Sequence, residues 1–387
     1  MSGLRVEVVT GAADLPAAWA SLVAAGSVVL HPSFLAAMAA APPTGSSHRY
    51  ALAWQGQRLV AAAGFHAVPL YPGSLGQAEA DASWPVRAFF RLADWLHRGT
   101  PHMLVCGHMA HADAPGLVCA PDVPDPALLL HELTEAVRRS LDRPVALVVL
   151  KQPDLGPAHG ALVPLGYHPV HTAQPTMRLP IDPSWGGFDA YLGAMRSKYR
   201  QRARSARKRG RSLARQPLDA DAILRHAVTL DGLLAPVLDR ADVAVAPVEA
   251  ATLAALKRSW GDALRVVLYR EADRPVAYAV SLAHGDRIEG MLVGLDDARN
   301  GPLKLYQNIL YDFVERAIDA GAAWLELGRT ALEIKSAIGA QPHRFPVYVR
   351  HPGWVLHRAL GFAVRRMQAP AFTRRHPFHA PPEPAGP

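Results

Sequence analysis

The sequence predicts an α/β (α+β) protein made of two similar domains. Segments with helical and with strand periodicity alternate along the chain, and their order in the first half returns in the second half. With 387 residues and 50% hydrophobic composition, the chain is long enough to bury two cores. We therefore expect two mixed, mostly antiparallel sheets flanked by helices.

The N-terminal domain is expected over residues 1–180. Gln55-Gly56-Gln57 separates two apolar runs and predicts a hairpin, and Asp125 is a good N-cap for the helix that follows it. The expected strands cover residues 4–9, 50–54, 58–68, 103–106, 116–119, 145–150 and 176–179. The expected helices cover residues 14–23, a stretch beginning near 32, residues 84–96 and residues 125–141.

The C-terminal domain is expected over residues 216–369. Leu360-Gly361-Phe362 closes it as Leu165-Gly166-Tyr167 closes the first domain. Expected helices cover residues 221–238, 248–264, 303–320 and 333–338, and expected strands cover residues 265–269, 276–283, 287–295, 323–327 and 345–350. Residues 370–387 are rich in proline and histidine, so we expect a flexible tail.

The segment between the domains, residues 185–215, is the most basic part of the sequence. It has no acidic residue between Asp189 and Asp219, and we expect one long helix that joins the domains. Apolar residues fall on one arc of that helix. The neighbouring arc carries a stripe made of Arg196, Arg200, Arg204, Arg207 and Arg211. The stripe is expected to bind an anion and to contribute little to stability, while a solvated surface stays an alternative.

The composition limits the other possibilities. The formal net charge is +8, and the basic segment supplies enough positive charge to leave the rest of the chain nearly neutral, which argues against a general nucleic-acid-coating protein. We see no signal peptide and no apolar run long enough to span a bilayer. Only Cys106 and Cys119 are present, and around His108, His111 and Asp113 they form no paired zinc motif. We expect a cytoplasmic protein without a metal.

Three short motifs indicate a family. Lys198-Tyr199-Arg200 lies in the basic segment, Leu327-Gly328-Arg329-Thr330 follows a predicted strand, and Glu333-Ile334-Lys335 precedes Gly339. With the order meander, helix, strand, short helix and strand, they resemble the GNAT acyltransferase fold. Two such units joined by a basic helix resemble the Fem-type aminoacyl transferases and their GNAT-like relatives. Motifs carry the resemblance over most of residues 175–365, and element order alone carries it over the N-terminal half.

The resemblance implies an N-acyltransferase that passes an activated acyl group to an amine. This reaction needs a base for the proton of the amine and a charge for the developing oxyanion. The Fem-type pattern has a lysine where Lys335 stands, so Lys335 is the expected oxyanion stabiliser. Glu289 stands where GNAT enzymes often carry a carboxylate base, and Tyr306 or Tyr348 is expected to protonate the leaving group. Without the resemblance, Lys335 and Glu289 could equally be exposed surface residues, and Tyr306 and Tyr348 could be buried tyrosines that only pack.

The donor is expected at Arg299, Asn300, Gly301 and Lys304, which correspond to the phosphate loop of the GNAT fold. This implies acyl-CoA or acetyl-CoA as co-substrate. Pro302, however, lacks an N–H and the second small residue of the loop is absent, so aminoacyl-tRNA gains weight as the donor.

The substrate and partners are expected to meet the basic segment. Substrate binding is assigned to Lys198, Tyr199, Arg200, Arg204 and Arg329. The acceptor is expected to be a small-molecule or lipid amine, and tRNA or an anionic membrane surface, such as the inner membrane, is expected to contact residues 196–215. A non-catalytic module that binds nucleic acid or membrane through this segment is the alternative from another class.

Overall fold

The computed structural model describes residues 4–23, 27–70, 101–108, 111, 114–151, 155, 160–171, 174–239, 247–367 and 372–379. The helix expected at residues 84–96 lies outside these residues. The chain forms two compact units, and neither is a contiguous range. Unit 1 contains residues 1–173, 238–260 and 345–369, and unit 2 contains residues 174–237, 261–344 and 370–387. No helix among the described residues is long and apolar enough to span a membrane.

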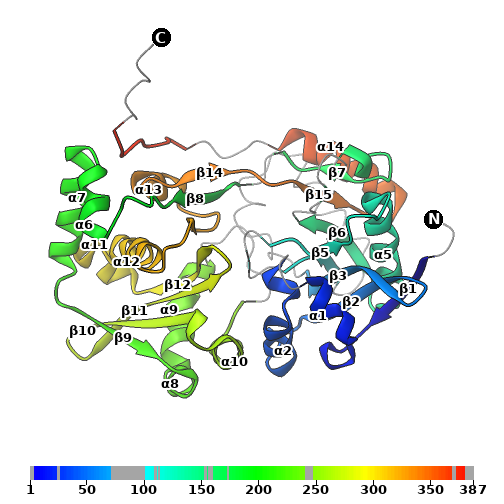
Figure 1. Ribbon diagram of the computed structural model, residues 1–387, viewed down its shortest axis with the longest axis horizontal. Coiled ribbons are helices and arrows are strands. Elements are labelled where there is room, and N and C mark those ends of the chain that lie inside the picture. The colour runs from blue at the N-terminus through cyan, green and yellow to red at the C-terminus, as the bar shows by residue number, and fades with distance from the viewer. Residues whose placement is uncertain are drawn as a thin grey trace, which may run out of the picture. The chain divides into compact units, whose positions relative to one another are not determined.

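Unit 1 is built on a sheet with the strand order β1-β2-β3-β4-β6-β15-β7, and β5 pairs with β3 beside β4 (Figure 1). The hairpin predicted around Gly56 is present. The strands are β1 (Leu4–Val9), β2 (Ser47–Gln55), β3 (Arg58–Pro69), β4 (His102–Cys106), β5 (Leu117–Cys119), β6 (Val145–Lys151), β7 (His168–Pro169) and β15 (Val347–Arg350).

The helices of unit 1 follow local signals in the sequence. The Asp125 carboxylate accepts a hydrogen bond from the Leu128 N–H at 2.9 Å, as expected of an N-cap. Asp14 instead ends a short 3₁₀ turn, and the first helix begins at Ala17. The helices are α1 (Ala17–Val23), α2 (Pro32–Ala40), α5 (Pro126–Ser140), α10 (Ala250–Trp260) and α14 (Trp354–Arg366).

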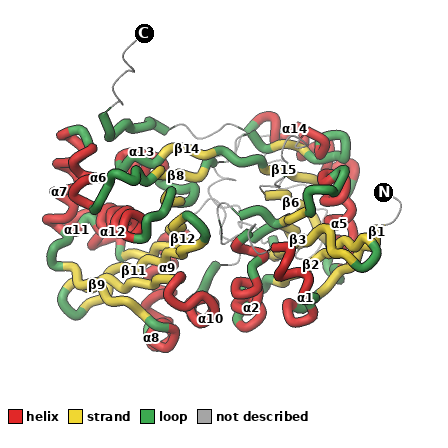
Figure 2. The backbone as a smooth tube through the Cα atoms, in the orientation of Figure 1, coloured by secondary structure: helices red, strands yellow, loops and turns green. Residues whose placement is uncertain are grey.

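Unit 2 is built on a sheet with the strand order β14-β8-β13-β12-β11-β10-β9. Helices α6, α7, α11 and α12 lie together beside it (Figure 2). Its strands are β8 (Thr176–Pro180), β9 (Leu213–Leu218), β10 (Leu264–Glu271), β11 (Arg274–His284), β12 (Arg287–Leu295), β13 (Trp324–Glu326) and β14 (Gln341–His343). Its helices are α6 (Phe188–Ala194), α7 (Ser197–Arg209), α8 (Ala220–Arg225), α9 (Ala227–Asp239, whose last two residues belong to unit 1), α11 (Asp297–Leu303), α12 (Leu305–Asp319) and α13 (Leu332–Ala337).

Each sheet takes one strand from the other half of the sequence. β8 precedes the basic segment but pairs with β13 and β14 of unit 2. β15 comes near the end of the chain but pairs with β6 and β7 of unit 1. The contiguous ranges expected from the sequence differ from these units because strand pairing is not local in sequence. Leu360-Gly361-Phe362 lies within helix α14.

The basic segment is not the single linking helix that the sequence predicted. It forms α6, a break at Met195 and Arg196, α7 and then strand β9, all of which belong to unit 2. The Arg200 guanidinium donates to the carbonyls of Gly193 at 3.3 Å and Met195 at 3.1 Å, so it caps the end of α6. This arginine of the stripe has a structural contact.

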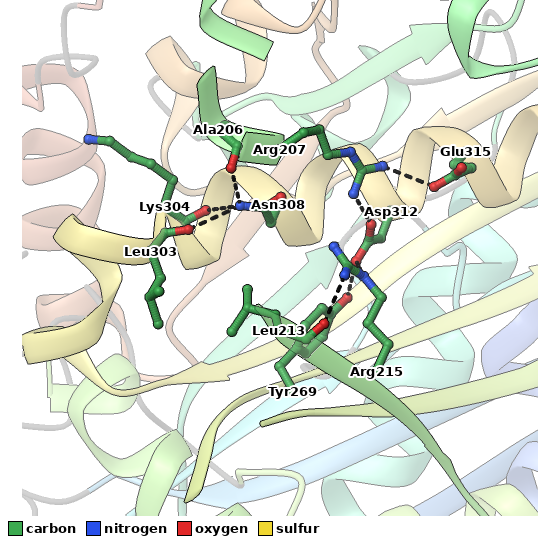
Figure 3. A network of polar contacts seen from close by, with 10 residues as sticks. All are labelled: Ala206, Arg207, Leu213, Arg215, Tyr269, Leu303, Lys304, Asn308, Asp312 and Glu315. Atoms are coloured by element: carbon green, nitrogen blue, oxygen red, sulfur yellow. Dashed lines mark hydrogen bonds and ion pairs between the residues drawn. The ribbon is translucent and has the colours of Figure 1, made fainter. Parts of the chain in front are cut away.

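Polar groups of α12 hold α7 in place (Figure 3). The Asn308 amide donates to the carbonyls of Ala206 at 2.9 Å and of Leu303 and Lys304 at 3.1 Å. The α7 helix ends at Gly210, where a Cβ atom would collide with the Asn308 side chain. Asn308 therefore joins the end of α7 to the junction of α11 and α12.

A second contact between α7 and α12 is charged. Asp312 forms an ion pair with Arg207, accepts from Arg215 Nε at 2.7 Å and accepts from the Tyr269 hydroxyl at 2.8 Å (Figure 3). The guanidinium carbon of Arg207 also lies 4.7 Å from the centroid of the Phe188 ring. Arg207 is therefore a structural residue, contrary to the expectation for the stripe.

The expected flexible tail is partly docked on unit 2. The Pro377 carbonyl accepts from the Arg196 N–H at 2.8 Å, and the Phe378 ring lies 5.4 Å from the ring of Trp185, centroid to centroid. Arg375 forms an ion pair with Glu333. Residues 372–379 thus cover the region around α13. The contact of Phe378 with Trp185 and the ion pair of Arg375 with Glu333 offset the conformational entropy that this part of the tail loses when it is ordered.

The two kinds of arginine on α7 have opposite expected effects on stability. Arg207→Gln removes two charge-assisted contacts in a largely buried position, so we expect the free energy of unfolding in urea to fall by about 1–3 kcal/mol. Arg204→Gln is the matched control on the exposed side of the same helix and is expected to change it by less than about 0.5 kcal/mol. Equal effects of the two substitutions would contradict the anchoring role of Arg207.

Candidate active site

The candidate site lies where strands β12 and β13 of unit 2 part. The two strands are parallel and pair only from Arg287 opposite Trp324 to Glu289 opposite Glu326. β12 continues to Leu295, with a bulge against β11 between Gly290 and Leu292. Beyond Glu289 no described strand pairs with β12 on this side, so its backbone edge is available to an extended ligand.

Four titratable side chains gather at this point. The strand register aligns Glu289, Glu326 and Arg178 on β12, β13 and β8. Residues aligned on neighbouring strands share one face of a sheet. The preceding apolar row, Ile288 and Leu325, faces the other way into the core that contains α12. Lys335 joins the group from helix α13.

All three residues that come from β12, β13 and α13 are buried. The exposed fraction is 6% for Glu289, 2% for Glu326 and 3% for Lys335. Arg178 Nε donates to the Glu326 carboxylate at 2.6 Å, and the Thr176 side chain also acts as a hydrogen-bonding neighbour that opposes the rise which burial causes in the pKa of this carboxyl. A buried carboxylate held in this way is positioned to accept a proton from a ligand.

Burial shifts the acidity of Lys335 and Glu326 in opposite directions. Desolvation lowers the pKa of Lys335 to about 7, and the nearby Glu326 carboxylate opposes part of this shift. Desolvation raises the pKa of Glu326, and Arg178 opposes part of that shift. An ammonium that loses its proton near neutral pH is typical of a functional lysine and is unlike a solvated surface lysine.

The residues expected to hold the donor phosphates adopt a different structure. Arg299 forms an ion pair with Glu271, and Gly301 and Pro302 lie inside helix α11. The Asn300 side-chain oxygen accepts from the Tyr306 N–H at 3.1 Å, so an amide of the first turn of α12 already has a partner. Lys304 has a left-handed backbone with φ 53°, and its side chain extends away from Asn308 (Figure 3).

The remaining predicted residues are scattered. Tyr306 packs against the core of unit 2, and burial raises the pKa of its phenol above the usual value. Arg329 is half-buried just after β13, and Lys198 and Arg204 are exposed on α7. Tyr199 packs partly against the core, and Tyr348 lies on β15 in unit 1, apart from the unit that contains Lys335.

Sequence reasoning did not select Glu326 and Arg178. Each is a single charged residue inside an otherwise apolar strand, in Trp324-Leu325-Glu326-Leu327 and Thr176-Met177-Arg178-Leu179. That pattern is a recognisable signal because charged side chains are rarely buried without a partner. Their pairing was hidden by the distance of 148 residues between them in the sequence.

Comparison with known proteins supports the fold. Residues 193–336 match the model of the acetyltransferase (GNAT) domain family. A crystal structure of FemX is similar over 92% of this chain and 100% of its own, with a TM-score of 0.53 and 10% identity. At this identity the similarity shows the fold alone. The two mixed, mostly antiparallel sheets flanked by helices confirm the fold class expected from the sequence. No curated protein matches the sequence.

Two further structures are less similar. A tandem GNAT protein from the clavulanic acid biosynthesis pathway matches 90% of this chain and 99% of its own, with a TM-score of 0.46 and 14% identity. The C-terminal domain of a putative lysylphosphatidylglycerol synthetase from Agrobacterium fabrum matches 69% and 82%, with a TM-score of 0.44 and 14% identity. The match of residues 193–336 to the GNAT domain family supports an acyltransferase.

Lys335→Met measures the cost of burying the lysine charge. The folded pKa of about 7 lies below the ordinary value of 10.5, so between these values the unfolded chain binds more protons and wild-type stability rises with pH. The stability advantage of Lys335→Met over wild type, measured by urea unfolding, should be largest below pH 7, where the lysine is charged in both states. It should shrink by about 1.4 kcal/mol per pH unit toward pH 10. A difference that does not vary with pH would show that Lys335 is solvated.

Proposed function

From the GNAT domain over residues 193–336, we propose that unit 2 transfers an acyl group from an activated thioester or ester carrier to an amine. The observation that carries this proposal is the buried group of Glu289, Glu326 and Lys335 at the point where β12 and β13 part. It brings together a carboxylate that accepts a proton and an ammonium that stabilises negative charge, which are the two requirements of the reaction.

The proposed reaction begins when an acceptor ammonium gives a proton to the Glu289 or Glu326 carboxylate. The amine nitrogen attacks the carbonyl carbon of the donor, and the carbonyl oxygen becomes an oxyanion. Lys335, in its ammonium form, stabilises that oxyanion in a water-poor setting where its charge acts strongly. The attacking nitrogen loses its second proton to solvent. Collapse then forms the neutral amide bond and expels the carrier thiolate or alkoxide, which takes up the first proton from the carboxylic acid. Tyr306 stays a second candidate for that last proton transfer.

The identity of the acyl donor is a separate part of the proposal, and one observation favours aminoacyl-tRNA over acyl-CoA. The α11–α12 junction offers few amides for a pyrophosphate, since the N–H groups of Arg299 and Asn300 donate to the Asp296 carbonyl and that of Tyr306 donates to Asn300. Asn300 thus occupies an amide that a phosphate oxygen would otherwise use. A carrier that is held by charge along a surface needs no such loop.

Helix α7 offers such a surface beside this junction. Several basic side chains on α7 and in the turn after it are exposed and have no ion pair among the described residues: Lys198, Arg202, Arg204, Lys208, Arg209 and, in the turn, Arg211. Asn308 joins α7 to the α11–α12 junction, so this basic face and Lys304 belong to one region of unit 2. We propose that it binds the phosphates of the carrier.

Lys335→Met is expected to abolish most transfer while the donor still binds. The loss of an oxyanion stabiliser should lower turnover by about 10²–10³-fold, and donor affinity measured by calorimetry should stay within about twofold. Lys257→Met is the matched control, because this lysine lies on α10 of unit 1, outside both the buried group and the basic face of α7. Turnover near wild type in Lys335→Met would contradict the electrostatic role and leave the carboxylates to act alone.

The combined variant Arg202→Gln, Arg204→Gln and Lys208→Gln is expected to weaken binding of aminoacyl-tRNA. The slope of log affinity against log salt should become less steep by up to about three, one unit for each lost phosphate contact. Thermal stability and acyl-CoA binding should not change. If tRNA binding is unaffected, the α7 face is a solvated surface. If binding occurs to tRNA or anionic vesicles but no acyl donor is used, the non-catalytic alternative is correct.

A further inference from the structure

Three histidines of unit 1 form a compact cluster outside the proposed active site. His48 on β2 and His66 on β3 are directly opposite each other in the antiparallel pairing. His108 follows β4, and its ring centroid lies 4.1 Å from that of His66 and 5.2 Å from that of His48. One ring nitrogen from each residue lies within 4.8 Å of the other two. The cluster thus brings three nitrogen donors to one point.

The cluster has unmet hydrogen-bonding capacity. His66 is completely buried, and neither of its ring nitrogens has a hydrogen-bond partner among the described residues. Nε2 of His48 is also buried without a partner there. A neutral imidazole has one donor and one acceptor nitrogen, and leaving both unsatisfied in the interior costs free energy. A buried polar group in this state points to a bound ion or water.

The backbone around the cluster is built closely enough to hold it. Gly107 has φ 105° and turns the chain so that His108 lies over β3. The Gly107 N–H donates to the Gly64 carbonyl at 2.9 Å. Gly116 packs against this turn so closely that a Cβ atom would collide with Gly107. A cavity of about 10 Å³ between His48, His108 and the Phe34 side chain has room for one water molecule or one metal ion.

We propose that His48, His66 and His108 bind a divalent first-row transition metal ion, with Zn²⁺ as the reference ion. Three neutral imidazoles are the ligand type that Zn²⁺, Ni²⁺ and Cu²⁺ accept, whereas Mg²⁺ and Ca²⁺ need oxygen ligands. Tetrahedral zinc with Zn–N bonds of about 2.0–2.1 Å needs nitrogens about 3.3 Å apart. The three rings are stacked within 4° of parallel, so metal binding requires them to rotate until their nitrogens converge on the ion.

The surroundings define what the metal does. The buried Lys151 ammonium donates to the His108 carbonyl at 2.9 Å, so the neighbouring charge is positive. A water in the cavity takes the fourth position, and its loss of a proton lowers the net charge of the site. The metal ties β2, β3 and the turn after β4 together, which makes it a structural site of unit 1, separate from acyl transfer.

The test uses the full-length protein after treatment with a chelator. Addition of Co²⁺ should produce the visible absorption bands of tetrahedral cobalt, Zn²⁺ should displace them, and Zn²⁺ should raise the melting temperature. His48→Gln and His66→Gln should each weaken Zn²⁺ binding at least tenfold in calorimetry. His131→Gln is the matched control, because this histidine of unit 1 lies on α5 and contacts Tyr167.

Two results would overturn the proposal. The first is a wild-type protein that shows neither cobalt bands nor Zn²⁺ binding at neutral pH, which would mean that water alone fills the cluster. The second is unchanged Zn²⁺ affinity in His48→Gln, whose side chain is only partly buried and whose substitution should leave the fold intact. His48→Gln therefore tests the proposal even if His66→Gln does not fold.

Discussion

Unit 2 depends on the burial of Lys335 beside Glu326. Removing an ammonium from water is costly, and this cost lowers the pKa of the lysine to about 7, while the nearby Glu326 carboxylate offsets part of it. Arg178 in turn neutralises Glu326 through a 2.6 Å contact. Because Glu326 lies next to both Lys335 and Arg178, the elements that carry these residues (β13, α13 and β8) must meet at one place. A stretch from the N-terminal half must therefore join the C-terminal sheet.

The pairing of β8 with β13 meets the same requirement. Without β8, Glu326 would be buried without its cation, a loss that is strongly destabilising in a protein interior. The strand that supplies Arg178 also supports α13 through β14, which pairs with β8 at Gln341 opposite Arg178. The position of the lysine is thus determined by strands whose paired residues, Arg178 and Glu326, are 148 residues apart in the sequence.

The sequence predicted most elements of the fold but not their partners. Periodicity and the Asp125 cap located the strands and helices to within a few residues, because these signals are local. The prediction of a single basic helix was wrong. A charge pattern does not reveal Asp312 and Asn308, which anchor α7 although they lie more than 100 residues away in the sequence. Lys335 was found through a motif. Glu326 and Arg178 were missed because only tertiary pairing shows that they are buried together.

The chemical role of unit 2 depends on the protonation state of Lys335, which can be measured directly. Wild-type protein with ¹³C-labelled lysine side chains is titrated by NMR, and Lys335→Met identifies the resonance. The structure predicts one lysine that titrates near pH 7 and whose resonance shifts when the acyl donor is added. If every lysine titrates near pH 10, Lys335 is solvated and cannot stabilise the oxyanion in the way proposed.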